Sequence, residues 1–213
     1  MAAARRPRIV VTAGPTREHV DPVRYLSNES SGRMGFAIAA SAAARNWDVT
    51  LVAGPVQLPT PKGVERIDVI SARDMLAAVR DAFRGADALY MSAAVSDWRP
   101  KRKLAGKWRK KDGGQQVASL ELVSNPDILA SVARQKGDRL VVGFALETGD
   151  GIRRAKAKMR RKGTDFVVLN DTSALSASRA SVTILGADGS VRELTDCTKD
   201  RIAEVLLDLA HPA

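Results

Sequence analysis

The sequence predicts an α/β protein built on a doubly wound, mostly parallel sheet that ends in a late antiparallel β-hairpin. Short apolar segments typical of buried strands alternate along the chain with segments typical of helices. The first predicted strand is followed by a long loop rich in Gly, Pro, Asn and Ser. With 45% hydrophobic residues but only 4% aromatics, the chain predicts a core of Val, Ile, Leu and Ala. Together these features favour a Rossmann-like architecture.

The first half of the chain predicts alternating strands and helices, with two successive strands at 48–53 and 65–70. Residues 9–13 form the first strand, and residues 14–32 form the long loop. A strand-to-helix connection normally needs about 2–6 residues, and open α/β sheets place their sites in such loops, so this one predicts a functional segment. Ser71 is the predicted N-cap of a later helix, supported by Asp74 three residues on. The remaining elements of this half are helices at 34–44 and 72–83 and strands at 48–53, 65–70 and 86–94.

The second half begins with a basic excursion at 99–116, which we expect to be a flexible strap, followed by a returning strand at 117–123. Asn125-Pro126-Asp127 predicts a helix start with Pro126 in the first turn. The other predicted elements are strands at 139–145 and 165–169, a basic helix at 151–162, a hairpin formed by 181–185 and 191–194, and a closing helix at 198–210.

Length and composition limit the class of protein. The 213 residues suit a single domain over 1–213. One cysteine, Cys197, excludes an internal disulfide framework, and it is expected to be inert. Residues 1–8 do not resemble a signal peptide, and no apolar run approaches the roughly 20 residues of a membrane span. We therefore expect a soluble, cytoplasmic protein.

The net charge of +10 is concentrated in two segments. Residues 101–111 and 153–162 each hold seven basic residues and no acidic one, and the rest of the chain, with 20 basic and 24 acidic residues, carries −4. Two local cationic patches suit a compact polyanion such as a nucleoside triphosphate as well as a phosphate backbone. The alternative is that both are solvated faces.

Several residues of the long loop suit the binding of an anion. Residues 31–35 enter a helix, so their amides could receive a phosphate or carboxylate. Alternatively, Gly32 and Gly35 only allow the helix to approach the sheet. Arg24 and Asn28 lie four residues apart. Asn28 can donate and accept, which suits holding a carboxylate as its charge changes, but it could equally satisfy loop backbone.

Other candidates follow later strands. Asp97 could accept a hydrogen bond from a ribose hydroxyl, or it could cap a turn. The backbone amides at 125–128, at the start of a predicted helix, suit phosphates. Phe144 is either a platform for a nucleotide base or a core residue. Lys158 and Lys162 share a helix face. In the strap, Lys107 could close over a triphosphate. One cysteine and two distant histidines predict no metal site within the protein.

Taken together, these segments resemble phosphopantothenoylcysteine synthetases over nearly the whole chain. The matching motifs are the loop Gly14-Pro15-Thr16-Arg17 with Asp21 to Asn28 and Ser30-Ser31-Gly32, then Ala93-Ala94-Val95-Ser96-Asp97-Trp98, Lys107-Trp108-Arg109-Lys110, Asn125-Pro126-Asp127-Ile128, residues 142–148 and Asn170-Asp171.

The resemblance implies an enzyme of coenzyme A biosynthesis that joins 4′-phosphopantothenate to cysteine. In the bacterial form CTP, with Mg²⁺, activates the carboxylate as an acyl-CMP and releases pyrophosphate, and cysteine then displaces CMP. Family members are homodimers, and many carry a phosphopantothenoylcysteine decarboxylase domain ahead of this region.

The resemblance also assigns roles to particular residues. Asn28 would hold the carboxylate and the acyl-CMP, with Arg24 nearby, and Lys107 would stabilise charge during transfer. The residues implied to bind the nucleotide are Met91, Ser92, Ala93, Asp97, Lys107, Pro126, Asp127, Ile128, Leu129, Phe144, Lys158 and Lys162.

The chain departs from the family in the strap, which usually reads Lys-Ile-Lys-Lys where this sequence has Lys107-Trp108-Arg109-Lys110. Arg109 keeps the charge but not the point geometry of lysine. Two other functions are considered. A Rossmann-like oxidoreductase would need a glycine fingerprint that the first loop lacks. A nucleic-acid-binding module would use the two basic segments, but the acidic remainder of the chain argues against it.

Overall fold

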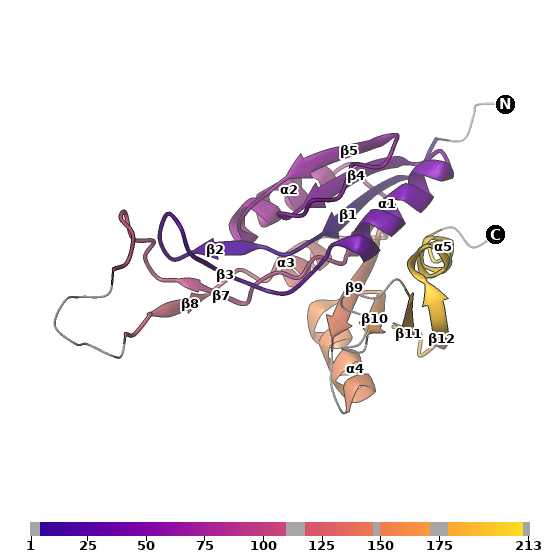
Figure 1. Cartoon of the computed structure of the whole chain (residues 1–213). Helices are drawn as coiled ribbons and strands as arrows, with labels where there is room; N and C mark the ends of the chain where they lie inside the picture. The colour runs from indigo at the N-terminus through magenta and orange to yellow at the C-terminus, as the bar shows by residue number, and fades with distance from the viewer. Residues whose placement is uncertain (1–4, 110–117, 147–149, 171–178, 211–213) are drawn as a thin grey trace.

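Eight strands form the central sheet of the computed structural model, which describes residues 5–109, 118–146, 150–170 and 179–210 (Figure 1). Their order across the sheet is β12-β11-β10-β9-β6-β1-β4-β5. The strands are β1 (Arg8–Ala13), β4 (Asp48–Ala53), β5 (Val64–Asp68), β6 (Ala88–Met91), β9 (Leu140–Leu146), β10 (Phe166–Asn170), β11 (Arg179–Gly186) and β12 (Val191–Thr198). The strands from β5 to β10 are parallel and β11 and β12 are antiparallel, which confirms the predicted fold class.

Helices cover both faces of this sheet. On one face lie α1 (Arg33–Ala44) and α5 (Lys199–Asp208), and Ile38 and Leu206 belong to the same buried cluster. The other face carries α2 (Ala72–Phe83), α3 (Ile128–Ala133) and α4 (Gly151–Lys162). The core is therefore split into two layers by a sheet of small and branched apolar residues, as the scarcity of aromatics predicts.

The chain reverses its direction of progress across the sheet between β1 and β6. From β1 it proceeds outward through β4 to β5, then returns to β6 and proceeds the other way through β9 to β10. The connections after β1 and β6 therefore leave in opposite directions and open a crevice at the carboxyl ends of the strands. This reversal fixes the place of the candidate site.

Two small antiparallel sheets lie beyond that end of the main sheet (Figure 1). The long loop contains β2 (Arg17–His19) and β3 (Tyr25–Ser27), and the basic excursion is bounded by β7 (Trp98–Pro100) and β8 (Leu122–Ser124). The sequence did not predict β2, β3 or β7, because strands of three residues are too short to show alternation.

Several predicted boundaries were wrong, among them the end of the second hairpin strand, which was predicted at 194 and lies at Thr198 because β12 pairs with β11 up to that residue. Within the described residues of 117–123 only the end is strand, because β8 pairs solely with three-residue β7. The strand predicted at 86–94 stops at Met91, where the Ser92 amide turns back to the Tyr90 carbonyl oxygen at 3.2 Å. Pro126 precedes the helix rather than lying in its first turn, because Asp127 is the N-cap. Residues 110–117 of the predicted strap lie outside the described residues.

The N-terminus of α2 forms as predicted. The Ser71 hydroxyl accepts from the Asp74 amide at 3.2 Å, and the Ser71 amide donates to an Asp74 carboxylate oxygen at 2.9 Å. This reciprocal pair is a capping box. The helix start was therefore readable from local sequence alone.

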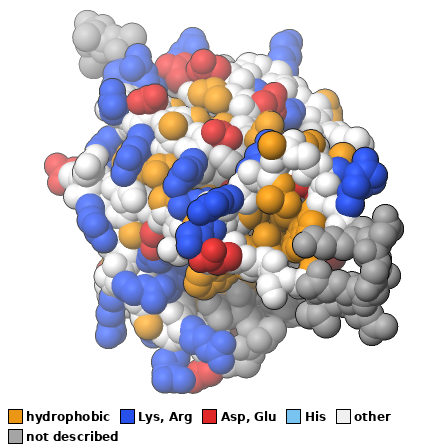
Figure 2. Space-filling view, turned by 90° about the vertical axis from the view of Figure 1, so that its left-hand side faces the viewer, with side chains coloured by type: hydrophobic (Ala, Val, Ile, Leu, Met, Phe, Trp, Pro, Cys, Tyr) orange, Lys and Arg blue, Asp and Glu red, His pale blue; other side chains and the backbone are white. Residues whose placement is uncertain are grey.

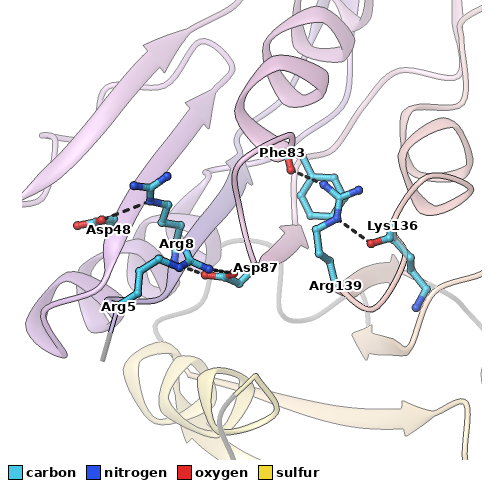
Figure 3. Close-up of polar contacts among 7 residues, drawn as sticks. All are labelled: Arg5, Arg8, Asp48, Phe83, Asp87, Lys136 and Arg139. Carbon is cyan, nitrogen blue, oxygen red and sulfur yellow. Dashed lines mark hydrogen bonds and ion pairs between the residues drawn. The ribbon is translucent and has the colours of Figure 1, made fainter. Parts of the chain in front are cut away.

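The amino ends of the strands, opposite the crevice, are joined by charged side chains (Figure 3). Asp87 accepts from the Arg8 amide at 2.7 Å and pairs with Arg5. Arg139 donates to the Phe83 carbonyl oxygen at 2.6 Å, and its guanidinium lies 4.2 Å from the centre of the Phe83 ring. These contacts tie β1 to the start of β6, and α2 to the start of β9, at the edge away from the site.

Candidate functional site

Two adjoining cavities, each of about 520 Å³, lie at the carboxyl ends of the parallel strands. This volume falls within the range of small-molecule sites. The first cavity lies against the start of α1 and the second against the start of α3. They share the lining residues Ala93, Val95, Asp97, Phe144 and Lys158. The site therefore occupies the crevice that the strand order creates.

The first cavity receives the amino-terminal end of α1. The N-cap Gly32 adopts a φ of +75°, which favours glycine, and no side chain caps the helix. Residues 28–35 all line the cavity. The uncapped first turn therefore offers backbone N–H groups and a positive dipole end to an anion, as the sequence suggested.

Gly35 lets α1 lie directly against β1. A Cβ atom at this position would lie 2.6 Å from the Ala13 Cβ and 2.7 Å from the Ser92 Oγ. The sequence left two alternatives for this glycine, close approach of the helix to the sheet and anion binding. The structure shows the close approach, and that approach is what brings the start of α1 to the cavity.

Side chains on β1 and the long loop hold the segment that follows β6. The Ser92 hydroxyl donates to the Thr12 carbonyl oxygen at 2.6 Å, and the Ala93 amide donates to the Thr12 hydroxyl at 3.1 Å. Asn28 Nδ2 lies 3.3 Å and 3.1 Å from the carbonyl oxygens of Ala94 and Val95. Asn28 therefore satisfies loop backbone, the alternative raised above, while its exposed side chain also lines the cavity.

In the second cavity, Asp127 joins α3 to α4. Its carboxylate accepts from the Ala130 amide at 3.0 Å and pairs with Lys162 at 2.5 Å. Burial acts to raise the pKa of Asp127, but Lys162 and the Ala130 N–H outweigh it and hold the pKa below its ordinary value. Among the amides at 125–128 that were predicted to suit phosphates, the Asn125 amide donates to the Asp97 carbonyl oxygen at 2.8 Å, and Pro126 has no N–H.

Lys158 and Phe144 form part of the wall between the cavities. Lys158 Nζ donates to the Phe144 carbonyl oxygen at 3.0 Å. Phe144 is half-buried and packs against the core under α1, yet it lines both cavities. Both readings of Phe144, core residue and candidate platform for a base, are compatible with this position.

The structure brings together most of the predicted site residues. Ser92 and Asn28 line the first cavity, and Ala93, Asp97, Phe144 and Lys158 line both. The predicted residues of the second cavity alone are Met91, Pro126, Asp127, Ile128, Leu129 and Lys162. Arg24 and Lys107 line neither cavity, so their roles stay predictions.

Arg24 instead joins the long loop to the basic excursion. The fully buried Asp21 accepts from Arg24 Nε and from the Trp108 amide, both at 2.9 Å, and Arg24 donates to the Trp108 carbonyl oxygen. Burial acts to raise the pKa of Asp21, but the Trp108 amide and the other N–H donors hold it well below its usual range. The Leu104 amide adds a bond of 2.8 Å to the Val20 carbonyl oxygen. Figure 1 shows this part of the chain reaching away from the main sheet.

Sequence reasoning missed Arg33 and Lys199 as site residues. Arg33 begins α1, Lys199 begins α5, and both line the first cavity with Asn170. Asn170 ends a parallel strand, so the rule for strand ends could have found it. Lys199 follows an antiparallel hairpin, and no local signal places it at the site.

Across residues 5–109, 118–146, 150–170 and 179–210, the structure contains no cluster of three or more His, Cys, Asp or Glu residues suited to hold a metal ion. Asp97 and Glu29 are the carboxylates among the described residues of the first cavity. No helix in the described part of the chain is long and apolar enough to cross a membrane.

The lowered pKa of Asp127 predicts a pH-dependent contribution to stability. Because the pKa is lower in the folded than in the unfolded chain, the contribution is present above about pH 4 and is lost as the pH falls toward the folded pKa. Asn can also cap a helix, so Asp127→Asn removes chiefly the ion pair with Lys162. We expect Asp127→Asn to lower the Tm at pH 7 and to approach wild type below pH 4, as measured by calorimetry between pH 3 and 7.

The exposed Asp81, paired with Arg84 at 3.3 Å, supplies the control Asp81→Asn. Exposed pairs contribute little, so its Tm should follow wild type throughout. A difference between Asp127→Asn and wild type that stays constant from pH 7 to 3 would contradict the assignment.

Comparison with known proteins identifies the family. The family described as "DNA/pantothenate metabolism flavoprotein C-terminal domain" matches residues 4–212. The coenzyme A biosynthesis bifunctional protein CoaBC of Vibrio cholerae is 43% identical over 209 residues, which cover 96% of this chain and 52% of that protein. The Escherichia coli K12 protein of the same name is 42% identical over 205 residues, covering 94% of this chain and 50% of the relative.

The crystal structure of the C-terminal domain of a CoaBC protein superposes with a TM-score of 0.82 at 38% identity. The match covers 96% of this chain and 94% of that domain. The chain thus spans about half the length of the curated relatives, and it is similar to the C-terminal domain of a CoaBC protein in fold as well as in sequence.

Proposed function

The chain belongs to the family of the DNA/pantothenate metabolism flavoprotein C-terminal domain, and from this premise we propose that it is a phosphopantothenate–cysteine ligase of coenzyme A biosynthesis. The whole of 1–213 would act as one ligase domain. The observation that carries the proposal is the pair of joined cavities at the strand reversal, because they gather residues that the resemblance assigns to the nucleotide and the carboxylate.

The proposed reaction has two steps. A carboxylate oxygen of 4′-phosphopantothenate attacks the α-phosphorus of CTP, an O–P bond forms, the α–β anhydride bond breaks, and pyrophosphate leaves. The amine of cysteine then attacks the activated carbonyl carbon, the C–N bond forms, the bond to CMP breaks, and the amine loses a proton. The first step is needed because a carboxylate is a poor electrophile, whereas CMP is a good leaving group.

The geometry supports a division of labour between the cavities. The uncapped start of α1 suits phosphate oxygens, and the Phe144 ring is available to a base at the shared wall. Asn28 lies in the first cavity, where it would hold the carboxylate and the acyl-CMP. Lys158 lies at the wall that the two cavities share, so its charge would lie between the part of the nucleotide in the first cavity and the part in the second.

Mg²⁺ would accompany the triphosphate. Mg²⁺ is commonly held by one or two carboxylates together with substrate phosphates, and Asp97 and Glu29 are the carboxylates of the described first cavity. This donor set fits such a shared site and not an all-protein cage. When bound, the ion would neutralise phosphate charge.

Pyrophosphate release tests the proposed function. The purified chain is incubated with 4′-phosphopantothenate, Mg²⁺ and either CTP or ATP, with and without cysteine. CTP-dependent release with formation of the cysteine amide is the expected result. Amide formation with ATP in place of CTP would overturn the nucleotide assignment, and no release with either nucleotide would overturn the ligase.

Lys107→Gln is expected to slow turnover by about tenfold or more while changing the KM for CTP by less than about threefold. The reason is that Lys107 lies on the excursion, outside both cavities, so it would act only when charge develops during transfer. Steady-state kinetics of amide formation measure both constants. The control is Lys103→Gln, at another exposed lysine of the same segment, which should keep the wild-type turnover number. An unchanged turnover number in Lys107→Gln would remove Lys107 from the mechanism.

The chain is expected to form a homodimer through the faces of β2–β3 and β7–β8. These short strands expose Tyr25, Trp98 and Leu122, and the turn between β2 and β3 exposes Val23, with 40–59% of each residue accessible. Figure 2, which views the molecule from this side, shows apolar side chains lying among Lys and Arg. Light scattering should give twice the 22.8 kDa chain mass, and Val23→Asp should shift the protein toward monomer. A wild-type monomer at assay concentration would contradict the dimer.

A further inference from the structure

The segment between β6 and β7 carries residues that line both cavities, among them Val95 and Asp97. Ser96 lies between these two residues and is buried, whereas Asp97 is exposed. The carbonyl oxygens of Ser96 and Asp97 accept from Asn125, the first from Nδ2 and the second from the amide, both at 2.8 Å. The Ser96 hydroxyl donates to the Trp98 carbonyl oxygen at 2.8 Å. The position of Asp97 at the cavities is therefore set through the backbone around Ser96.

The other side of this segment is held by Thr16, which is fully buried and lines neither cavity. The Ser96 amide donates to the Thr16 hydroxyl oxygen at 3.0 Å. The Thr16 amide donates to the Ala94 carbonyl oxygen at 3.3 Å, and the Thr16 carbonyl oxygen accepts from the Ser27 hydroxyl at 2.8 Å. Thr16 thus joins the segment after β6 to the hairpin β2–β3, which leads directly to Asn28.

The hydroxyl group is the part of Thr16 that its backbone cannot replace. The bond between the Ser96 amide and the Thr16 hydroxyl is buried, and a buried N–H that loses its acceptor costs its full desolvation free energy. Valine keeps the branched shape of threonine and removes the acceptor, whereas serine keeps the acceptor and removes the methyl group. These two substitutions at Thr16 therefore separate the hydrogen bond from the packing.

We propose that Thr16 is a positioning residue of the ligase site, which acts through the Ser96 amide to fix Asp97 for the nucleotide. This inference rests on the proposed function, in which Asp97 belongs to the nucleotide site. Without the hydroxyl, the backbone beside Asp97 shifts to find another partner for the Ser96 amide. A misplacement of about 1 Å caused by a residue outside the site can cost about 10²-fold in rate, so a small shift here has a measurable effect.

Steady-state kinetics of amide formation by the full chain test this role. Thr16→Val should raise the KM for CTP about fivefold to tenfold, and Thr16→Ser should stay within about twofold of wild type. Thr16→Cys, whose thiol is a weak acceptor, should give a KM above that of Thr16→Ser, and it supplies the measurement if Thr16→Val does not fold. A purely structural role would lower the Tm and leave the KM of the folded enzyme unchanged.

The matched control is Thr164→Val. Thr164 is buried and lines neither cavity, and its hydroxyl oxygen has no hydrogen-bond partner within the part of the chain that the structure describes. The same substitution at this position should therefore keep the wild-type KM for CTP. An unchanged KM in Thr16→Val, or a raised KM that Thr16→Ser does not reverse, would overturn the proposal.

Hydrogen exchange of the Ser96 amide, followed by NMR of the protein without ligands, gives a readout that needs no activity. Exchange should be about tenfold or more faster in Thr16→Val than in wild type, because the amide has lost its acceptor. Thr16→Ser and Thr164→Val should exchange at the wild-type rate. An unchanged rate in Thr16→Val, or an equal rise in Thr164→Val, would contradict the link between Thr16 and Ser96.

The two readouts separate this inference from the proposed function. If wild type forms no cysteine amide but exchange of the Ser96 amide depends on the Thr16 hydroxyl, the ligase assignment fails and the hold of Thr16 on the segment stands. If wild type forms the amide and Thr16→Val keeps the wild-type KM for CTP, the ligase stands and the positioning role of Thr16 fails.

Discussion

Replacing Asn28 by alanine is expected to lower turnover about 10²–10³-fold without unfolding the protein. Asn28 lies in the first cavity, and its Nδ2 bonds to Ala94 and Val95 fix the segment that follows β6. Alanine would remove both the proposed contact to the substrate carboxylate and this support. Because the side chain is exposed, water can replace the lost backbone bonds and the stability cost stays small.

Chemical quench of the Asn28→Ala reaction, followed by separation of nucleotide species, shows which step is slowed. Accumulated acyl-CMP with little amide would place Asn28 in the second step, and loss of pyrophosphate release would place it in both. Ser27→Ala is the control, because the Ser27 hydroxyl bonds the Thr16 carbonyl oxygen at 2.8 Å in the same hairpin but lines neither cavity. Turnover of Asn28→Ala at the wild-type level would refute the role.

Gly35→Ala is expected to damage both stability and nucleotide binding. The added methyl group would meet Ala13 at 2.6 Å, Ser92 at 2.7 Å and the Thr12 carbonyl oxygen at 2.8 Å, of which the last is backbone. Overpacking of this kind costs about 1–3 kcal/mol, which lowers the Tm by about 2–12 °C in a domain of this size. Since α1 must move away from β1, we expect catalytic efficiency with CTP to fall by about 10²-fold.

The matched control is Gly85→Ala, measured by the same calorimetry and kinetics. A Cβ at Gly85 would meet its nearest neighbour, Arg8, at 3.8 Å, an ordinary contact, and the position lies far from both cavities. It should keep the wild-type Tm within about 2 °C and full activity. If Gly35→Ala behaves like Gly85→Ala, the start of α1 does not depend on its close approach to the sheet.

Local sequence predicted the central fold well, because its signals are local. The strand at 48–53, the helix at 72–83 with its capping box and the helix at 151–162 coincide with β4, α2 and α4. Because strands and helices alternate along the chain, a parallel sheet could be predicted. The site could then be predicted at the carboxyl ends of the parallel strands. Periodicity and capping therefore sufficed where each element contains several turns or a buried strand.

Features that depend on tertiary contacts could not be predicted in this way. The placement of Lys199 beside Arg33 follows from the packing of α5 on α1, across more than half of the sequence. The bond between Asp21 and Trp108 joins two loops whose sequences carry no sign of each other. Pro126 was misplaced because Pro is favourable both in the first turn and just before the N-cap, and only the Asp127 side-chain geometry decides between them.

The pairing of α1 with α5 has a consequence for the order in which the site matures during synthesis. A growing chain can form β1, α1 and β4 early, but Lys199, which also lines the first cavity, is synthesised long after β4. Contacts between such distant segments form late, since closing a long loop costs entropy before any contact repays it. The first cavity is therefore completed by the same docking of α5 that covers the apolar face of α1, so chains that have not yet formed α5 have both an open core and an incomplete candidate site.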